Sequence, residues 1–385
     1  MKTPITGFVT DGFERVALEF SKNFSDRGEI GAGVFVMVDH EVVVDLIGGW
    51  ADEEQARPWA SDTLVDFYSV GKAFVGLLAL RLIDEGKVGL DDLITKQWPE
   101  FGAGGKANAT VRHALCHRAG VPAIGEAMTD EDLWNWESMV SGLARTAAWF
   151  DPGSRHAYHT NTYGHLVGEI IRRTSGRMPH DLMTELCAEL GADVYFGVPD
   201  EHLGRCADVV WGGGLGALPH SIEELEGDAL MAMKSYFNPP GYSSLGLMNT
   251  DRWRSAQIPS TNGHGTAEGV CRIYSALLRP DFVVSQELLA EATAVQSSGY
   301  CPILGEDVAF GLGFKPTSIR RPFGPNPRSF GHFGTGGALG FADPDSGVAF
   351  GYVMNQVTPR WQSTRNRALI DATFESLGSI VPLVD

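Results

Sequence analysis

The sequence lacks both a CxxC cysteine pair and an apolar run long enough to cross a membrane. A spanning helix needs about 18 or more consecutive apolar residues. Residues 1–7 also lack the apolar core of a signal peptide. An odd number of scattered cysteines favours free thiols in a reducing compartment. These absences predict a soluble, cytoplasmic protein. The five cysteines are Cys116, Cys187, Cys206, Cys271 and Cys301.

Positive charge is scarce. The chain has 30 Lys and Arg residues against 48 Asp and Glu residues, which gives a formal net charge of -18. Nucleic acid and anionic membrane surfaces are therefore not expected as partners, because both need a basic surface. The 385 residues are 43% hydrophobic and 20% charged, a composition ordinary for a globular protein with a large core. Nothing in the sequence indicates an oligomeric state.

One stretch organises the rest of the chain: Asp66–Lys72, followed by the apolar run Ala73–Ile83. The run is apolar on nearly every side, so it predicts a helix buried all round. Gly86 is placed to end this helix as a left-handed cap. We expect the stretch to be a strand end or loop that turns into the buried helix.

Ser69 and Lys72 stand at the mouth of that helix in a Ser-x-x-Lys arrangement. Residues three apart share a helix face, with a rise of about 4.5 Å between them. A serine hydroxyl needs a base to become a nucleophile, and a lysine can serve if burial or a nearby cation lowers its pKa. The alternative is a serine N-cap and a solvated lysine. The apolar character of the helix argues against that alternative.

Elements near the two termini predict strands and terminal helices. A helix is expected over 11–24 and a β-hairpin over 32–47. A second hairpin is expected over 340–354, and a helix over 363–377 closes the chain. The economical packing is an α+β fold with one antiparallel sheet built from both chain ends.

The middle of the chain predicts mainly helices. We expect helices over 110–119, 162–174 and 267–278, with 129–225 mostly helical and 236–261 a loop-rich excursion near the active site. The whole chain then forms one catalytic unit. Its α/β lobe takes about 1–68 and 300–385, and its helical lobe about 69–299. Ser69 would open into the cleft between them, the usual place for a small-ligand site.

Six stretches, in this order and spacing, resemble the serine β-lactamase-like superfamily, most closely the class C-like branch called family VIII carboxylesterases. The resemblance covers most of the chain and implies a β-lactamase/penicillin-binding-protein-like transpeptidase fold. The stretches are Gly48–Asp52, Phe67–Lys72, Arg112–Gly120, Pro152–His159, Ser260–Ala267 and Gly331–Pro344.

The resemblance implies that Tyr158 is the catalytic tyrosine. A phenol beside a charged Lys72 would have a lowered pKa and could exchange protons with Ser69. The two groups titrate as a pair, so neither is singled out as the base. The backbone N–H groups of Ser69 and Thr335 would form the oxyanion hole. Without the resemblance, Tyr158 would be interpreted as a core aromatic after a turn.

The chain departs from the β-lactamase pattern at two places. His332-Phe333-Gly334 stands where β-lactamases have Lys-Thr-Gly, and Thr160 stands where they have Asn, with Asn161 one residue later. His332 should be mostly neutral at pH 7 and gain charge as the pH falls toward about 6. Gly334 would let a substrate approach the strand closely. These changes disfavour β-lactam hydrolysis and leave ester hydrolysis.

The sequence therefore predicts a serine hydrolase that cleaves small carboxylic esters, with short acyl chains favoured and no cofactor. The alternatives are β-lactam or amide hydrolysis, or D-amino-acid peptidase activity, on the same site. A catalytically silent binding or regulatory relative is the alternative of another class. His113 and His117 have the i, i+4 spacing of zinc ligands, but no third ligand is evident, so no metal is expected.

Overall fold

The computed structural model describes residues 3–211, 224–243, 246–358 and 362–378. Its main sheet has seven strands in the order β1-β3-β2-β13-β12-β11-β10, and each neighbouring pair is antiparallel. Strands from both ends of the chain meet where β2 pairs with β13. The predicted antiparallel sheet is therefore confirmed. Its strands are β1 (Ile5–Val9), β2 (Gly31–Val38), β3 (Glu41–Gly49), β10 (Lys315–Pro316), β11 (Phe330–Phe333), β12 (Leu339–Asp343) and β13 (Val348–Met354).

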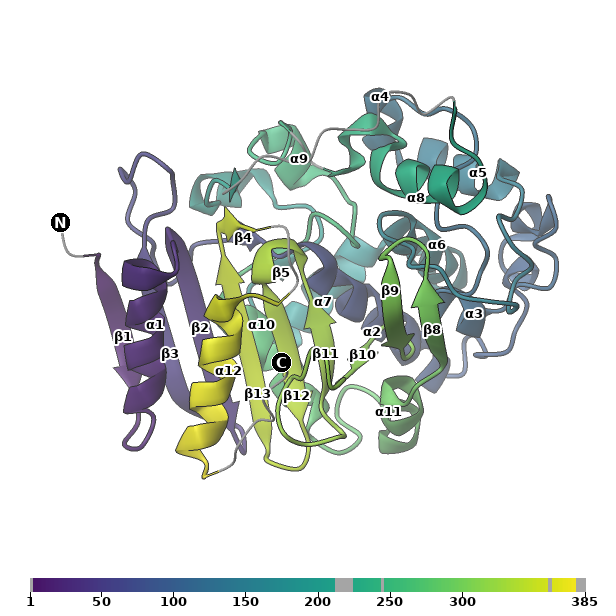
Figure 1. Cartoon of the computed structure of the whole chain (residues 1–385). Helices are drawn as coiled ribbons and strands as arrows, with labels where there is room; N and C mark the ends of the chain where they lie inside the picture. Colours follow the sequence, from purple (N-terminus) through teal and green to yellow (C-terminus); the bar gives the residue numbers. More distant parts are fainter. Residues whose placement is uncertain (1–2, 212–223, 244–245, 359–361, 379–385) are drawn as a thin grey trace.

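The two terminal helices cover one face of this sheet. Figure 1 shows α1 (Glu14–Asp26) and α12 (Thr364–Ser376) side by side in front of the strands, with α10 (Ala267–Leu277) behind them. A buried ion pair ties the C-terminal helix to the N-terminal part of the chain, because Arg365 Nη1 lies 2.7 Å from Glu29 Oε1. The Tyr352 hydroxyl donates to the same carboxylate.

Helices form the other side of the molecule, with α2 (Gly71–Asp84) at their centre (Figure 1). Eleven of its fourteen residues are buried, as the apolar run predicts. Gly86 follows with a φ of 71°, the left-handed conformation expected of a helix-ending glycine. The other helices are α3 (Val111–Leu115), α4 (Asp130–Leu133), α5 (Trp136–Arg145), α6 (Thr162–Ser175), α7 (Pro179–Leu190), α8 (Gly227–Phe237), α9 (Asp251–Ser255) and α11 (Gln286–Thr293).

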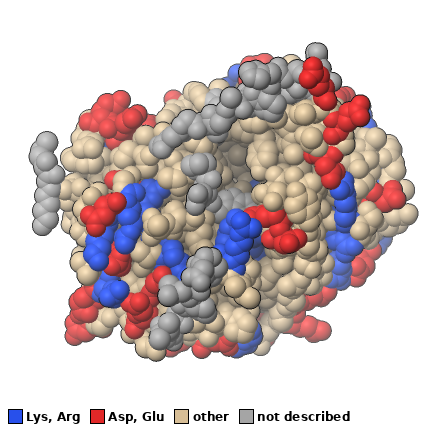
Figure 2. Space-filling view, viewed as in Figure 1, with Lys and Arg blue, Asp and Glu red and all other residues tan. Residues whose placement is uncertain are grey.

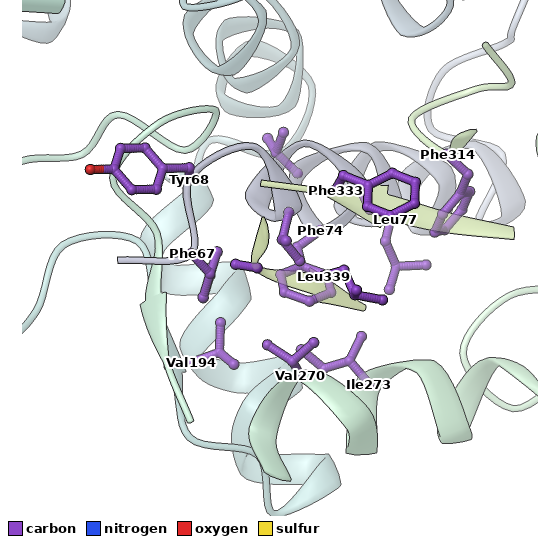
Figure 3. Packing of buried hydrophobic residues seen from close by; sticks show 14 of the residues in the cluster. Phe67, Tyr68, Phe74, Leu77, Val194, Val270, Ile273, Phe314, Phe333 and Leu339 are labelled. Atoms are coloured by element: carbon purple, nitrogen blue, oxygen red, sulfur yellow. The ribbon is translucent and has the colours of Figure 1, made fainter. Parts of the chain in front are cut away.

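Aromatic and aliphatic side chains join α2 to α10. Figure 3 shows Phe74 of α2 facing Val270 and Ile273 of α10, while the Tyr68 ring points away from this cluster. Phe67 packs edge-to-face on Phe74 with ring centroids 5.7 Å apart. This packing fixes the start of α2 against the main sheet.

The remaining described strands are short. They are β4 (Val65–Asp66), β5 (Val194–Tyr195), β6 (Val210–Trp211), β7 (His264–Gly265), β8 (Ser297–Cys301), β9 (Glu306–Phe310) and β14 (Gln356–Val357). Within the described ranges, no helix combines the length and apolar character needed to cross a membrane.

The structure differs from the sequence expectations at a few elements. The helix expected over 110–119 ends at Leu115, because the chain turns through His117, whose φ is 64°. The β8–β9 hairpin and strand β1 were not expected, since short polar strands carry a weak pattern. The loop-rich region over 236–261 contains a 3₁₀ helix (Pro240–Ser243) and the short helix α9. Residues 212–223 and 244–245 of the expected regions lie outside the described residues.

The contact between α2 and the loop before β10 generates the first prediction. A Cβ added at Gly76 would lie 2.8 Å from the Cα of Gly313, which is backbone and cannot rotate away. Overpacking of this kind costs about 1–3 kcal/mol and should exceed the roughly 1 kcal/mol that alanine gains in a helix. We expect Gly76→Ala to lower the free energy of unfolding, measured by chemical denaturation.

Gly204→Ala is the matched control, because a Cβ there meets no atom within 4 Å. This control should change the free energy of unfolding by no more than about 0.5 kcal/mol, the usual range for exposed positions. Equal behaviour of the two variants would contradict a close backbone contact at Gly76.

Candidate active site

A strained turn carries Ser69. The chain leaves β4 at Asp66, passes through a 3₁₀ turn over Tyr68–Val70 and enters α2. Tyr68 has a φ of 51°, which a bulky residue adopts only when its surroundings impose it. The two oxygens of the buried Asp66 carboxyl group accept the Tyr68 N–H at 2.8 Å and the Trp253 Nε1–H at 3.0 Å. Asp66 thereby fixes the turn, a role that the sequence alone did not indicate.

Lys72 lies within hydrogen-bond distance of Ser69. Its Nζ is 2.9 Å from Ser69 Oγ and donates to the backbone oxygen of Ser260, also at 2.9 Å. The lysine is fully buried, and burial holds its pKa well below the ordinary value. A neutral amine has a lone pair, so it is able to take a proton from the Ser69 hydroxyl. The arrangement excludes the alternative of a solvated lysine.

Tyr158 completes a group of three with these residues. Lys72 Nζ lies 4.9 Å from the centroid of the Tyr158 ring. Burial raises the pKa of Tyr158 well above its ordinary value, and the hydrogen bond with the Ser69 side chain opposes this rise. The expectation that a charged lysine acidifies the phenol is therefore wrong for the resting site. Burial disfavours the charged form of each group and so favours an amine beside a phenol.

Hydrogen bonds to Asn161 hold Ser260 and Thr261 next to Lys72. Ser260 Oγ donates to the backbone oxygen of Asn161 at 2.7 Å, and Thr261 Oγ1 donates to Asn161 Oδ1 at 2.9 Å. A Cβ at Gly71 would lie 2.1 Å from the Pro259 oxygen. The absence of a side chain on that glycine thus lets the segment pack directly against the start of α2. The sequence showed Asn161 only as a one-residue offset from the β-lactamase pattern. It did not indicate the Ser260 backbone oxygen, because any residue type supplies such an oxygen.

His332 and Phe333 end β11, and the His332 ring stacks on the Tyr158 ring with centroids 6.4 Å apart. His332 is buried, and its Nδ1 donates to the Phe333 oxygen at 2.7 Å. Burial, with Lys72 and Lys315 nearby, holds the pKa of His332 well below its ordinary value. The expected gain of charge near pH 6 is therefore wrong. Phe333 is also buried and stacks on Phe323 with centroids 4.5 Å apart.

Gly334 lets its own backbone pack closely against the backbone at Phe67. A Cβ at this position would lie 2.2 Å from the Phe67 backbone oxygen. The lack of a side chain brings the end of β11 against the turn that carries Ser69. This explains the glycine by packing instead of the expected approach of a substrate. Thr335 follows directly and faces the same cavity as Ser69.

The cavity at Ser69 has a volume of about 700 Å³. Figure 2 shows this face of the molecule hollowed near its middle, with basic and acidic side chains side by side at the rim. Tyr236, Tyr242 and Thr261 line the cavity, which confirms that the 236–261 region lies beside the candidate site. The other lining residues are Tyr68, Thr160, Asn161, Trp211, Phe237, Ser243, Leu304, Glu306, Arg320, Arg321 and Gln362.

The charged side chains in this lining form one cluster. Glu306 pairs with Arg321 at 2.5 Å and with Arg320 at 2.6 Å. Two cations share one carboxylate, so the cluster carries about one excess positive charge. This is a local exception on a chain with a net charge of -18.

His113 and His117, the two histidines with the spacing of zinc ligands, form hydrogen bonds with different partners. His113 Nδ1 accepts the Thr110 N–H at 3.3 Å, whereas His117 Nδ1 accepts the His159 N–H at 3.1 Å. In the part of the chain that the structure describes, no three His, Cys, Asp or Glu side chains are grouped to hold a metal ion. All five cysteines are buried and free.

A family model and a curated relative both match most of this chain. A family model described as Beta-lactamase matches residues 15–374. The curated protein Esterase/beta-lactamase LipL from Mycobacterium tuberculosis is 28% identical over 367 residues, covering 92% of this chain and 83% of that protein.

Two solved structures superpose over nearly the whole chain. One is a novel penicillin-binding protein homologue from Caulobacter crescentus, with a TM-score of 0.87 and 36% identity, covering 97% of this chain and all of that one. The other is a family VIII carboxylesterase, with the same TM-score and coverage and 30% identity.

The geometry predicts that Ser69 is the acylated nucleophile. A fluorophosphonate should label the wild-type chain once, and intact mass followed by peptide mapping should place the adduct on Ser69. Ser69→Ala should lose the adduct while its circular dichroism stays that of the wild type, because removing one hydroxyl costs little stability.

Ser243→Ala is the control, since Ser243 lines the same cavity and its hydroxyl donates to the Tyr236 oxygen. We expect this variant to be labelled as the wild type is. An adduct that persists in Ser69→Ala would contradict the assignment.

Proposed function

The chain belongs to the Beta-lactamase family, and we propose that it is a carboxylesterase that works through an acyl-enzyme on Ser69. The family and its esterase relatives identify a serine hydrolase. The observation that carries the finer proposal is the buried contact of 2.9 Å between Lys72 Nζ and Ser69 Oγ. A lysine kept out of water beside a serine has the base strength and position to activate it.

Acylation begins when the neutral Lys72 amine takes the Ser69 proton. Ser69 Oγ then forms a bond to the ester carbonyl carbon, and the carbonyl oxygen becomes an oxyanion. We assign the backbone N–H groups of Ser69 and Thr335 as its donors, because both residues face the same cavity.

Collapse of this intermediate breaks the ester bond. The alcohol oxygen leaves with a proton from the Tyr158 phenol, and the lysine ammonium returns the proton to tyrosine. Water then attacks the acyl-enzyme carbonyl and the same pair takes its proton. The pair returns that proton to Ser69 Oγ as the bond between Oγ and the acyl carbon breaks, and the acid departs. The raised pKa of Tyr158 suits this role, since the phenol is protonated when the leaving group needs a donor.

Short acyl esters are the substrates that His332-Phe333-Gly334 favours over β-lactams. A β-lactam presents a carboxylate, and penicillin-recognising relatives meet it with a lysine and a hydroxyl at this motif. Here His332 is neutral and Phe333 is packed into the core. An ester has no carboxylate to hold, and its alcohol leaves more easily than an amine.

β-Lactam or amide hydrolysis is the second candidate, because Arg320 and Arg321 line the same cavity. Their excess positive charge could hold a carboxylate from the cavity rim. The mycobacterial relative is named as both an esterase and a β-lactamase, which supports keeping this candidate. A silent binding relative is disfavoured, since burying a lysine beside a serine hydroxyl is costly without a use for the pair.

Lys72→Ala and Tyr158→Phe should each lower kcat for p-nitrophenyl butyrate by about 10²–10⁴, the scale of general acid–base groups. The double variant should lose little more than the worse single variant, because residues that act as a unit are not additive. Steady-state kinetics on the folded variants measures both effects.

The pH profile gives a control for the lysine. Because burial lowers the Lys72 pKa, the neutral amine persists to a lower pH than in an exposed lysine, and activity should fall as the pH drops through that lowered pKa. Lys72→Ala should lack this acidic limb. Near-normal kcat in either single variant would remove the role given to that residue.

The wild-type protein should prefer p-nitrophenyl acetate or butyrate to a chromogenic cephalosporin by at least about tenfold in kcat/KM. A missing charge-assisted hydrogen bond costs roughly 1.5–3 kcal/mol, or one to two decades. Because His332 stays neutral, the ratio of cephalosporin kcat/KM to ester kcat/KM should not rise as the pH falls from about 9 to about 6.

Arg320→Gln separates the two candidates. If the rim holds a carboxylate, this variant should lower cephalosporin turnover more than ester turnover. Comparable efficiency of the wild type on the cephalosporin at neutral pH would favour the second candidate.

A further inference from the structure

His117 contacts the backbone on both sides of Tyr158. Its backbone oxygen accepts the Ala157 N–H at 3.1 Å, and its Nδ1 accepts the His159 N–H at 3.1 Å. The N–H of Tyr158 itself donates to Cys301 Sγ at 3.2 Å. The three backbone donors over 157–159 are therefore all accounted for, and His117 accepts two of them.

The imidazole also packs in an aromatic group around the phenol. Its centroid lies 4.9 Å from that of Tyr158, 4.8 Å from Tyr163 and 4.4 Å from Phe310. Tyr158 stacks on Phe310 at 5.6 Å with an interplanar angle of 7°. Backbone hydrogen bonds and ring contacts thus restrain the same tyrosine from two directions.

The acceptor at Nδ1 requires a neutral ring with its proton on Nε2. Burial holds the pKa of His117 well below its ordinary value, and His159, Lys72, His332 and Lys315 act in the same direction. A charged ring would put a donor against the His159 N–H. The surroundings therefore favour the form that the hydrogen bond needs.

The backbone conformation of His117 limits which residues could replace it. Its φ of 64° is left-handed, a region that glycine and asparagine tolerate and most other residues resist. Asparagine also carries an oxygen at the position of Nδ1, so it could accept the same hydrogen bond.

We propose that His117 is a positioning residue that holds the Tyr158 phenol against Ser69 and Lys72. This inference rests on the proposed serine chemistry and goes beyond it by assigning a residue that does not touch the reacting atoms. Proton transfer needs heavy atoms within about 2.6–3.2 Å, so a shift of about 1 Å in the phenol should be costly.

Three substitutions separate the acceptor from the other features of His117. His117→Asn keeps the acceptor and tolerates the backbone. His117→Gly tolerates the backbone but has no acceptor, and His117→Phe keeps an aromatic ring without the acceptor. We expect about 10–100-fold slower fluorophosphonate labelling of Ser69 in the glycine and phenylalanine variants. The asparagine variant should stay within about fivefold of the wild type.

The decisive measurement repeats these substitutions in a Tyr158→Phe background. If His117 acts through the phenol, His117→Gly should slow labelling by less than about threefold there. A loss as large as in the wild-type background would overturn the proposal, because a residue that only supports folding would give that result. Equal rates for His117→Asn and His117→Gly would overturn it as well.

His40→Phe controls for backbone strain, because His40 also has a positive φ, 71°, and lies in the β2–β3 turn. It should lower the thermal midpoint without slowing the labelling of Ser69. Labelling needs Ser69 held beside Lys72, and the Tyr158 phenol shares a hydrogen bond with the Ser69 side chain. The dependence of labelling on His117 therefore remains measurable if no ester is hydrolysed. In that case the ester proposal fails and the positioning proposal is judged separately.

Discussion

The exclusion of water from Lys72 is the constraint on which the candidate site depends. An ammonium group loses most of its stabilisation when it leaves water, so the buried side chain is driven toward the neutral amine. The same burial holds Tyr158 as a phenol and His332 as a neutral imidazole. The uncharged forms of the Lys72, Tyr158 and His332 side chains are therefore favoured before a substrate reacts.

This burial is produced by close backbone packing. The glycine at the start of α2 admits the Pro259–Ser260 segment, and the glycine after β11 admits the Phe67 oxygen. These contacts bring the Ser260 oxygen and Thr335 to the turn that carries Ser69. Such contacts are possible only without a side chain, so these two glycines are explained by backbone packing.

The sequence predicted the features that depend on local pattern. The buried helix, its end at Gly86 and the antiparallel sheet from both termini followed from periodicity and turn residues. Ser69, Lys72 and Tyr158 lie together as the resemblance implied. The predicted ionisation failed for Tyr158 and His332, because burial is set by elements distant in sequence. The roles of Asp66 and His117 were also hidden, since a hydrogen bond to backbone leaves no spacing pattern.

The meeting of both chain ends in one sheet has a consequence for biosynthesis. β11 and Thr335 leave the ribosome long after the turn that carries Ser69, and the N-terminal strands β1, β3 and β2 gain their neighbour β13 later still. Contacts between such distant segments form late because a large loop must close first. A growing chain therefore holds its serine, lysine and tyrosine without the strand that completes the cavity. Reactivity would arise only after α12 has been synthesised and docks, when Arg365 meets Glu29.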